Sequence, residues 1–192
     1  MKARENPFRS ERVIETIRYT CTDGDLDTLI AKLAALGNRA AIVGPHGAGK
    51  TTLLEDLASA LEIRGFRIVP VRLSTDDRRL PRAWSRRAAC LGPRDIVCLD
   101  GAEQLSALRW LWFRWRARRA GGLLVTSHSQ GRLPMLIACT TSPDLLEGIV
   151  RRLAPSPAAG APPAGELFRR HRGNLRDALR ELYDFHACSF RL

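Results

Sequence analysis

The chain contains very little lysine and no long apolar segment. Only three of its 31 basic residues are lysines, and all the others are arginines. No apolar run approaches the roughly 20 residues that a membrane-spanning helix needs, so we expect no membrane partner. The N-terminal stretch MKARENPFRSER carries too much charge for a secretory signal peptide. These absences predict a cytoplasmic protein.

Cysteine is present, but not in a pattern that binds zinc or builds a disulfide framework. The five cysteines are odd in number and show no C-x-x-C spacing. Three of them lie in or beside apolar runs, where cysteine acts as a small core residue. A reducing compartment without a zinc site is therefore expected for Cys21, Cys90, Cys98, Cys139 and Cys188.

Size and charge set the next limits. A chain of 192 residues, 45% hydrophobic, can bury one α/β core and a small appendage. Its net charge of +11 predicts an anionic partner such as nucleic acid. A preference for arginine over lysine also arises from a GC-rich genome, without any functional meaning. Both explanations of the charge stay open at this point.

Residues 44–51 read GPHGAGKT and match the complete phosphate-binding pattern G-x-x-x-x-G-K-[ST]. Glycines let backbone N–H groups turn toward a polyphosphate, and the following helix adds the partial positive charge of its N-terminus. The Lys50 ammonium can reach the β- and γ-phosphates, and the Thr51 hydroxyl can ligate Mg²⁺. The pattern predicts ATP and Mg²⁺ as cofactors. The residues expected to bind the nucleotide are Gly44, Pro45, His46, Gly47, Ala48, Gly49, Lys50, Thr51 and Thr52.

The neighbouring sequence supports this interpretation over that of a plain glycine-rich turn. Residues 39–43 form a short apolar run of the size of a buried parallel strand. After the loop, leucine and alanine recur at helical spacing over residues 53–61, and Gly65 follows as a helix stop. Strand, glycine loop and helix is the order that the pattern requires.

About fifty residues later, four apolar residues, 96–99, precede Asp100. This run resembles the Walker B strand of P-loop ATPases, and the resemblance implies that Asp100 holds Mg²⁺ through its water shell. The alternative is an aspartate that merely ends a strand. The string DGAEQ then resembles the Asp-Gly-x-acid form of NACHT and related STAND ATPases, which implies that Glu103 polarises the attacking water or orients Mg²⁺ and that turnover is slow. The alternative for Glu103 is an acid favoured by the dipole of the next helix.

Residues 123–128, LLVTSH, end a predicted strand with polar side chains. They resemble the sensor-1 segment of AAA+ and STAND proteins, with His128 in place of an arginine, and also the switch histidine of ABC ATPases. Either resemblance implies that His128 contacts the γ-phosphate or the attacking water. A polar turn after a strand is the alternative.

The C-terminal part follows a linker rich in proline, alanine and glycine, residues 154–165, which we expect to be extended. Beyond it, GNLRDALRELY resembles the sensor-2 lid helix of AAA+ proteins and implies that Arg176 contacts the γ-phosphate. The alternative is structural, with Asn174 as a helix N-cap and Asp177 as its partner.

Taken together, these segments resemble ASCE P-loop ATPases of the AAA+/STAND (NACHT-like) type. Strands alternating with helices predict a three-layer α/β fold with a mainly parallel sheet and a small C-terminal helical lid. The predicted strands cover residues 39–43, 66–73, 95–99, 122–127 and 135–140. The predicted organisation is an N-terminal arm and helix (1–38), a P-loop ATPase core (39–153), the linker (154–165) and the lid (166–192).

A tryptophan-rich helix is predicted over residues 104–120, with five arginines among its aromatic residues. Its simplest arrangement packs one stripe on the sheet and leaves Trp110 and Phe113 on another face, where they can be exposed. Exposed aromatic residues beside arginines can stack on nucleobases or anchor a protein partner. A solvated arginine face is the alternative. The stripe expected to pack on the sheet is Leu105, Leu108, Trp112 and Trp115.

The leading functional prediction is a slow Mg²⁺-dependent ATPase that acts as a nucleotide-dependent switch or loader, with nucleic acid or a protein as its partner. Homo-oligomerisation is compatible with this class. The alternatives are a non-hydrolysing nucleotide-gated adaptor, an ABC-like ATPase and a small-molecule kinase. The ABC alternative lacks an LSGGQ signature, and the kinase alternative lacks a recognisable acceptor pocket.

Overall fold

The computed structural model describes residues 6–8, 25–74, 80–81, 83–155 and 160–189. Contacts between Cα atoms divide the chain into two compact units. We call Cys21–Gly44 with Lys50–Cys139 the sheet unit, and Met1–Thr20, Pro45–Gly49 and Thr140–Leu192 the helical unit. The phosphate-binding loop connects them covalently, because Pro45–Gly49 groups with the helical unit and Lys50 resumes the sheet unit. Each unit is described separately.

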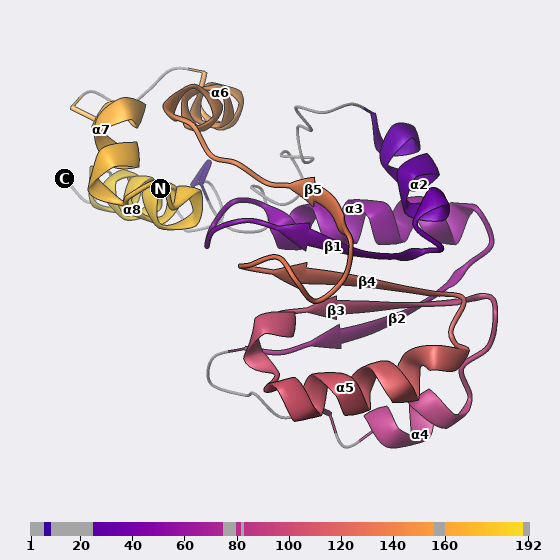
Figure 1. The fold of residues 1–192 in the computed structure, drawn as a ribbon. Coiled ribbons are helices and arrows are strands. Elements are labelled where there is room, and N and C mark those ends of the chain that lie inside the picture. Colours follow the sequence, from indigo (N-terminus) through magenta and orange to yellow (C-terminus); the bar gives the residue numbers. More distant parts are fainter. Residues whose placement is uncertain (1–5, 9–24, 75–79, 82, 156–159, 190–192) are drawn as a thin grey trace. The chain divides into compact units, whose positions relative to one another are not determined.

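The sheet unit contains five strands in the order β2-β3-β4-β1-β5 (Figure 1). All four strand pairs are parallel, which confirms the predicted parallel sheet. Pro70 lies in β2, at one edge of the sheet, where its missing N–H costs no ladder hydrogen bond. The strands are β1 (Arg39–Val43), β2 (Arg67–Arg72), β3 (Asp95–Asp100), β4 (Gly122–Ser127) and β5 (Met135–Ala138).

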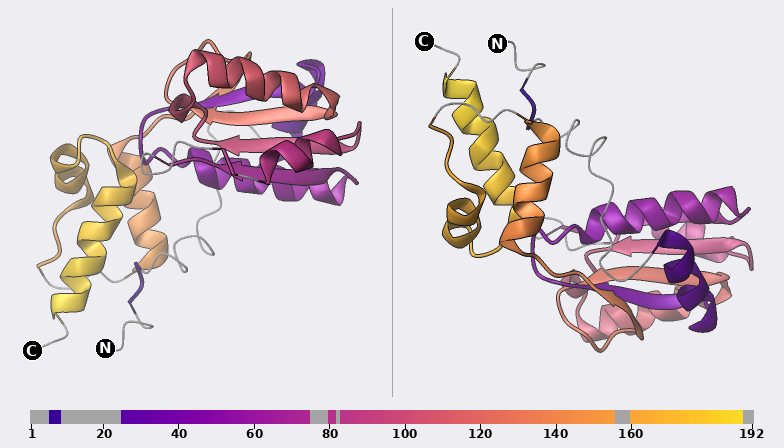
Figure 2. Two further views of the ribbon diagram at one scale, coloured as in Figure 1. Left: turned by 90° about the horizontal axis from the view of Figure 1, so that it is seen from below. Right: turned by 90° about the horizontal axis from the view of Figure 1, so that it is seen from above.

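Helices cover both faces of this sheet, so the unit has three layers, as predicted (Figure 2). On one face lie α2 (Leu26–Ala35) and α3 (Lys50–Ile63). The other face carries α4 (Trp84–Ala89) and α5 (Ala107–Arg116). Helix α3 packs through leucines that recur at helical spacing and are almost fully buried: Leu53, Leu54, Leu57 and Leu61.

The two cysteines that lie within strands or directly after them are buried. Cys98 and Cys139 belong to the core, whereas Cys90 and Cys188 are exposed. All four have free thiols, and Cys21 lies outside the described residues. Burial raises the pKa of the Cys98 thiol to about 12, so this residue acts as a small apolar core side chain.

Helix α5 packs through a different face from the one that its sequence predicts. Phe113 and Trp110 are buried, 0% and 6% exposed, although the sequence places them on a face that can be exposed. Leu108 and Trp115, predicted to pack on the sheet, are 80% and 53% exposed. Trp112 of the same predicted stripe is 43% exposed. The predicted packing face is therefore wrong.

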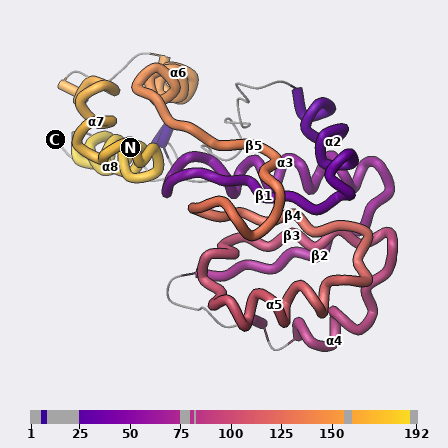
Figure 3. The backbone as a smooth tube through the Cα atoms, in the orientation of Figure 1, coloured from indigo at the N-terminus to yellow at the C-terminus, as the bar shows by residue number. Residues whose placement is uncertain are grey.

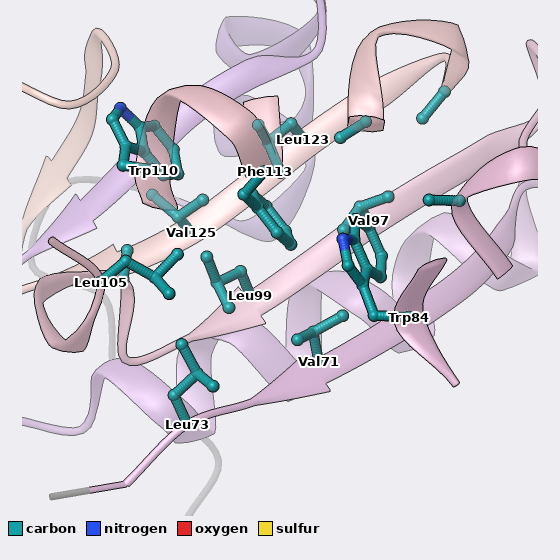
Figure 4. Packing of buried hydrophobic residues seen from close by; sticks show 14 of the residues in the cluster. Val71, Leu73, Trp84, Val97, Leu99, Leu105, Trp110, Phe113, Leu123 and Val125 are labelled. Atoms are coloured by element: carbon teal, nitrogen blue, oxygen red, sulfur yellow. The ribbon is translucent and has the colours of Figure 1, made fainter. Parts of the chain in front are cut away.

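The reason is that α5 has two apolar stripes, and its neighbours select one of them. The helix begins at Ala107 after the N-cap Ser106, so Leu105 is buried before the helix starts rather than on one of its faces. Trp84 of α4 then stacks on Phe113, with ring centroids 4.5 Å apart and planes at 20° (Figure 4). This aromatic pair fixes the rotation of α5 about its axis, and helical periodicity alone cannot reveal it.

The helical unit consists of α6 (Pro143–Leu153), α7 (Ala164–Arg170) and α8 (Leu175–Ser189) (Figure 3). Phe8, from the predicted N-terminal arm, is 4% exposed and belongs to their shared core. Helix α7 begins inside the predicted linker, of which residues 156–159 lie outside the described residues. Gly173, with φ of +81°, lies between α7 and α8. In the described parts of the chain, no helix is long and apolar enough to cross a membrane.

Candidate nucleotide-binding site

The candidate site lies at the carboxyl ends of three adjacent strands of the sheet unit. Strand β4 pairs with β1 on one side and with β3 on the other. The residue after β1, Gly44, donates its N–H to the carbonyl of Ser127 in β4 at 3.1 Å. The ends of β1, β4 and β3 therefore bring together Gly44, Thr126 and Asp100. In parallel α/β sheets, this edge is where ligands bind.

The backbone of the phosphate-binding loop requires its glycines. Gly47 and Gly49 have φ of +72° and +80°, a region that L-residues with side chains rarely adopt. A Cβ atom on Gly44 would lie 2.5 Å from the carbonyl oxygen of Cys139. Lys50 is 9% exposed, and its Nζ donates to the Gly44 carbonyl at 2.8 Å. The lysine side chain is therefore turned back toward Gly44, the residue that follows β1.

Thr51 and Asp100 lie side by side in the sheet unit. Thr51 Oγ1 donates to the Asp100 carboxylate, 3.1 Å from Oδ2 and 3.3 Å from Oδ1. Thr126, 1% exposed at the end of β4, donates its hydroxyl to Asp100 Oδ1 at 2.7 Å. Two hydroxyls thus orient one carboxylate at the strand ends. Hydroxyl and carboxylate oxygens are ligands of the kind that Mg²⁺ prefers.

Thr126 is a site residue that the sequence analysis did not single out. Besides donating to Asp100, its hydroxyl accepts the Gly101 N–H at 2.9 Å and so links β4 to the turn after β3. Arg72 was also missed: its Nε lies 3.5 Å from Asp100 Oδ2, and its Nη2 donates to Glu55 at 2.8 Å. Arg72 pairs in register with Asp100. This relationship becomes visible only once the pairing of β2 with β3 is known.

The backbone conformation of the residue after Asp100 requires glycine. Gly101 has φ of +87°, and a Cβ atom there would lie 2.7 Å from the carbonyl oxygen of Leu73. A glutamate directly after Asp100 would therefore be strained in this turn. The nearest acid along the chain is instead Glu103, in the short 3₁₀ helix Ala102–Gln104.

Glu103 and His128, predicted separately as catalytic residues, are in contact. His128 Nε2 lies 3.1 Å from Glu103 Oε1, and both side chains are about three-quarters buried. The other carboxylate oxygen, Glu103 Oε2, is buried, and the described residues provide it with no hydrogen-bond partner. The charges of Arg132 and Glu103 interact. Burial lowers the pKa of the Arg132 guanidinium, and the negative charge of Glu103 opposes that shift.

The helical unit holds the remaining predicted residues. A Cβ atom on Gly47 would lie 2.0 Å from Asn174 Oδ1, so the loop packs directly against the start of α8. Asn174 Oδ1 accepts the backbone N–H groups of Arg176 and Asp177, at 3.1 and 3.3 Å. The structural alternative for Asn174, an N-cap, is therefore present. Arg176 is exposed in the first turn of the same helix.

The other residues predicted to bind the nucleotide differ in their exposure to solvent. Pro45 and His46 are exposed, and Thr52 is half-buried in the first turn of α3. Their contacts to a nucleotide stay predictions, as does that of Ala48, which is 3% exposed. Among the described residues there is no cluster of three or more histidine, cysteine or acidic side chains that could hold a metal ion.

Several solved structures resemble the fold of this chain. No protein-family profile and no curated protein matches it. A variant of Thermotoga maritima RuvB superimposes with a TM-score of 0.56 at 18% identity, over 88% of this chain and 64% of RuvB. The RuvB Holliday junction branch migration motor of the same organism gives 0.53 at 20% identity, over 86% and 63%. The chain thus spans less than two thirds of the length of these RuvB chains.

The chain shares the α/β fold of these RuvB structures. This agrees with the resemblance to the ASCE division that the sequence motifs carry, whereas the NACHT-like subtype stays a prediction. Within this fold, the observed residues fit Mg²⁺ and a nucleoside triphosphate. The loop has the backbone that only glycine adopts easily, a lysine turned back toward Gly44, and a hydroxyl beside an oriented carboxylate.

Proposed function

We propose that this chain binds ATP with Mg²⁺ and hydrolyses it slowly, as a nucleotide-dependent switch or loader. The observation that carries the proposal is the contact of Thr51 with Asp100, joined at the strand ends by Thr126. A threonine at the start of α3 and an aspartate at the end of β3 are the two protein groups that hold Mg²⁺ in P-loop ATPases.

Each group has a distinct role in this proposal. Lys50 exchanges its bond to the Gly44 carbonyl for the β- and γ-phosphates, and loop N–H groups contact the same phosphates. Thr51 and Asp100 would hold the magnesium ion. When bound, the ion would supply positive charge beside the phosphate oxygens. Glu103 accepts a proton from water, while His128 and Arg176 respond to the γ-phosphate.

Slow turnover follows from the state of Glu103. A general base must be able to contact the proton that it removes, but Glu103 Oε1 is already paired with His128. The other oxygen, Oε2, is buried. The same observation favours a second candidate function, a nucleotide-gated adaptor that binds ATP and does not hydrolyse it.

Phosphate release and ATP affinity, measured together, test the proposal. We compare the wild type with Lys50→Ala and, as a matched control, Lys32→Ala, because Lys32 lies on α2 and contacts a β5 carbonyl. Loss of ATP binding in Lys50→Ala alone supports the site, and retained micromolar affinity would refute it. Tight binding by the wild type without any phosphate release would leave the adaptor as the function.

A further inference from the structure

The outer face of α5 carries four large apolar side chains that the described residues leave exposed. Leu108 is 80% exposed, Leu111 58%, Trp112 43% and Trp115 53%. Their spacing of three and four residues places them along one side of the helix, opposite the buried Phe113. We call these four residues the tryptophan face. Exposed apolar groups clustered in this way mark an interaction site more often than single exposed ones do.

Arginine side chains lie close to the two exposed indole rings. The Arg116 guanidinium carbon lies 5.9 Å from the ring centroids of both Trp112 and Trp115, and that of Arg118 lies 5.1 Å from Trp115. Guanidinium groups in such positions interact with the ring faces and keep their N–H groups available for anions. The rings and the charges therefore form one surface rather than two separate features.

No acidic residue offsets this charge nearby in the sequence. Residues 104–143 contain no aspartate or glutamate, and neither do residues 78–94. Helix α4, which lies beside α5 (Figures 1 and 2), adds two exposed arginines, and Arg116 donates to the Ser85 carbonyl of α4. The arginines of the two helices and of the turn after α5 are Arg86, Arg87, Arg109, Arg114, Arg116, Arg118 and Arg119.

We propose that the tryptophan face binds single-stranded nucleic acid, with unpaired bases stacked on Trp112 and Trp115 and phosphates bound by the surrounding arginines. Stacking on aromatic side chains inside a positively charged surface is the general mode of single-strand binding. Only unpaired bases expose the faces that such stacking needs, so a duplex satisfies the arginines but not the indoles.

Charge favours nucleic acid over a protein as the occupant. Nucleic-acid interfaces are much more positive than protein–protein interfaces, whose apolar centres are depleted of charge. Here the guanidinium groups lie on the rings themselves rather than at a distant rim. A second copy of this chain would bring two arginine-rich faces together, and like charges repel.

This inference names the partner of the proposed ATPase, and it rests on the proposed function only for the coupling of binding to ATP turnover. Binding itself requires no nucleotide. It can therefore be measured without ATP, and Lys50→Ala is expected to bind nucleic acid like the wild type. Failure of the nucleotide site and failure of the tryptophan face thus give different results.

The first experiment measures the affinity of a labelled oligothymidylate of about 20 nucleotides, long enough to cover one site, by fluorescence anisotropy without ATP. We expect Trp112→Ala with Trp115→Ala to weaken binding roughly tenfold or more, since two stacking contacts are lost. Trp112→Phe with Trp115→Phe keeps two rings and is expected to restore most of the affinity. Ile63→Ala, at an 86% exposed position of α3, is the control and leaves affinity unchanged.

Intrinsic fluorescence reports on stacking directly. Trp84 and Trp110 are 1% and 6% exposed, so quenching by oligothymidylate is expected to come from Trp112 and Trp115. The double phenylalanine variant is expected to bind but to lose this quenching. Quenching that persists in that variant would place the bases elsewhere and overturn the proposal.

The arginines are tested by salt dependence. Affinity for a single strand falls as salt rises, and the slope of log affinity against log salt is negative. Between about 50 and 200 mM salt, removing two phosphate contacts makes this slope less negative by about 1.4. We expect this for Arg114→Ala with Arg118→Ala. The control, Arg169→Ala with Arg180→Ala, removes two exposed charges from the helical unit and leaves the slope unchanged.

Three outcomes would overturn the proposal. The first is unchanged affinity in the double alanine variant of Trp112 and Trp115 while circular dichroism shows it folded. The second is a duplex of equal length that binds as tightly as the single strand and does not depend on the tryptophans. The third is binding of a synthetic acidic amphipathic helical peptide under conditions where oligothymidylate does not bind, which would assign the face to a protein partner.

Discussion

His128 Nε2 lies 3.1 Å from Glu103 Oε1, and the two residues come from different segments at the strand ends, after β4 and after β3. A carboxylate near the nucleotide site is thereby joined to the residue that directly follows β4, the strand between β1 and β3. In the proposed ATPase, a movement of His128 when the γ-phosphate binds would also alter the position of Glu103, the proposed general base.

This relationship predicts that the two residues act as a unit. We expect Glu103→Gln to reduce phosphate release about 100-fold or more, the usual effect of losing a general base, while ATP affinity stays within a few-fold. Adding His128→Ala to Glu103→Gln is expected to have little further effect, because residues that act together are not additive. Steady-state phosphate release by the two single variants and the double variant provides the measurement.

The helical unit offers a chemically matched control for this cycle. His171 Nε2 lies 2.6 Å from Glu181 Oε2, in a partly buried pair outside the candidate site. His171→Ala and Glu181→Gln are expected to leave turnover unchanged. If effects at Glu103 and His128 simply add, their contact has no role in the reaction.

The turn after Asp100 gives a prediction about stability. We expect Gly101→Ala to destabilise the protein by about 1–3 kcal/mol, because an alanine there needs a positive φ and meets the Leu73 carbonyl oxygen at 2.7 Å. Its N–H bond to Thr126 would also be disturbed. Thermal or urea unfolding measures the change.

Gly148 is the control for this substitution. It lies in the middle of α6, has no positive φ, and an added Cβ would meet no atom within 4 Å. Gly148→Ala is therefore expected to stabilise the protein by up to about 1 kcal/mol. Equal effects at the two glycines would mean that the turn at Gly101 tolerates a side chain.

Helix α5 allows the packing face to be tested with two apolar residues of one helix. We expect Phe113→Ala to lower the free energy of unfolding by about 3–5 kcal/mol, because a fully buried ring leaves a cavity. Leu108→Ala, at an 80% exposed position, is expected to change it by less than about 0.5 kcal/mol. Urea unfolding monitored by circular dichroism distinguishes the two. A larger loss of stability for Leu108→Ala than for Phe113→Ala would mean that α5 packs through the face that helical periodicity predicts.

Much of the fold could be predicted because the core strands are short apolar runs that are followed by glycine or by polar residues. The loop after β1, Asp100 after β3 and His128 after β4 were located in this way, and parallel strands place such residues at one edge. These predictions depend on local sequence alone. The contact between Thr51 and Asp100 then follows from the fold.

The remaining features depend on contacts between distant segments. Arg72 approaches Asp100 only because β2 pairs in register with β3. The rotation of α5 depends on Trp84, which lies on a separate helix. The burial of Phe8 with α6 and α8 depends on residues more than a hundred positions away. Such contacts leave no local periodicity that a sequence pattern can reveal.

The last prediction concerns pH and the core of the helical unit. His186 is 5% exposed in α8, with its ring centroid 5.0 Å from that of Phe8, and burial lowers the pKa of its imidazole. In the unfolded chain histidine titrates near about 6.5, so below that pH the unfolded state binds more protons than the folded state. The stability contributed by neutral His186 is therefore fully present above this pH and is lost as the pH falls.

His186→Phe removes this titration and keeps a ring beside Phe8. We expect hydrogen exchange in α8 of the wild type to become faster, relative to the variant, as the pH falls from about 7.5 to 5.5. Comparing the two proteins at each pH cancels the chemical dependence of exchange on pH, which is the same for both backbones outside the substituted residue. A constant ratio of their exchange rates across this range would show that His186 has the same pKa in the folded and unfolded states and that its burial does not couple folding to pH.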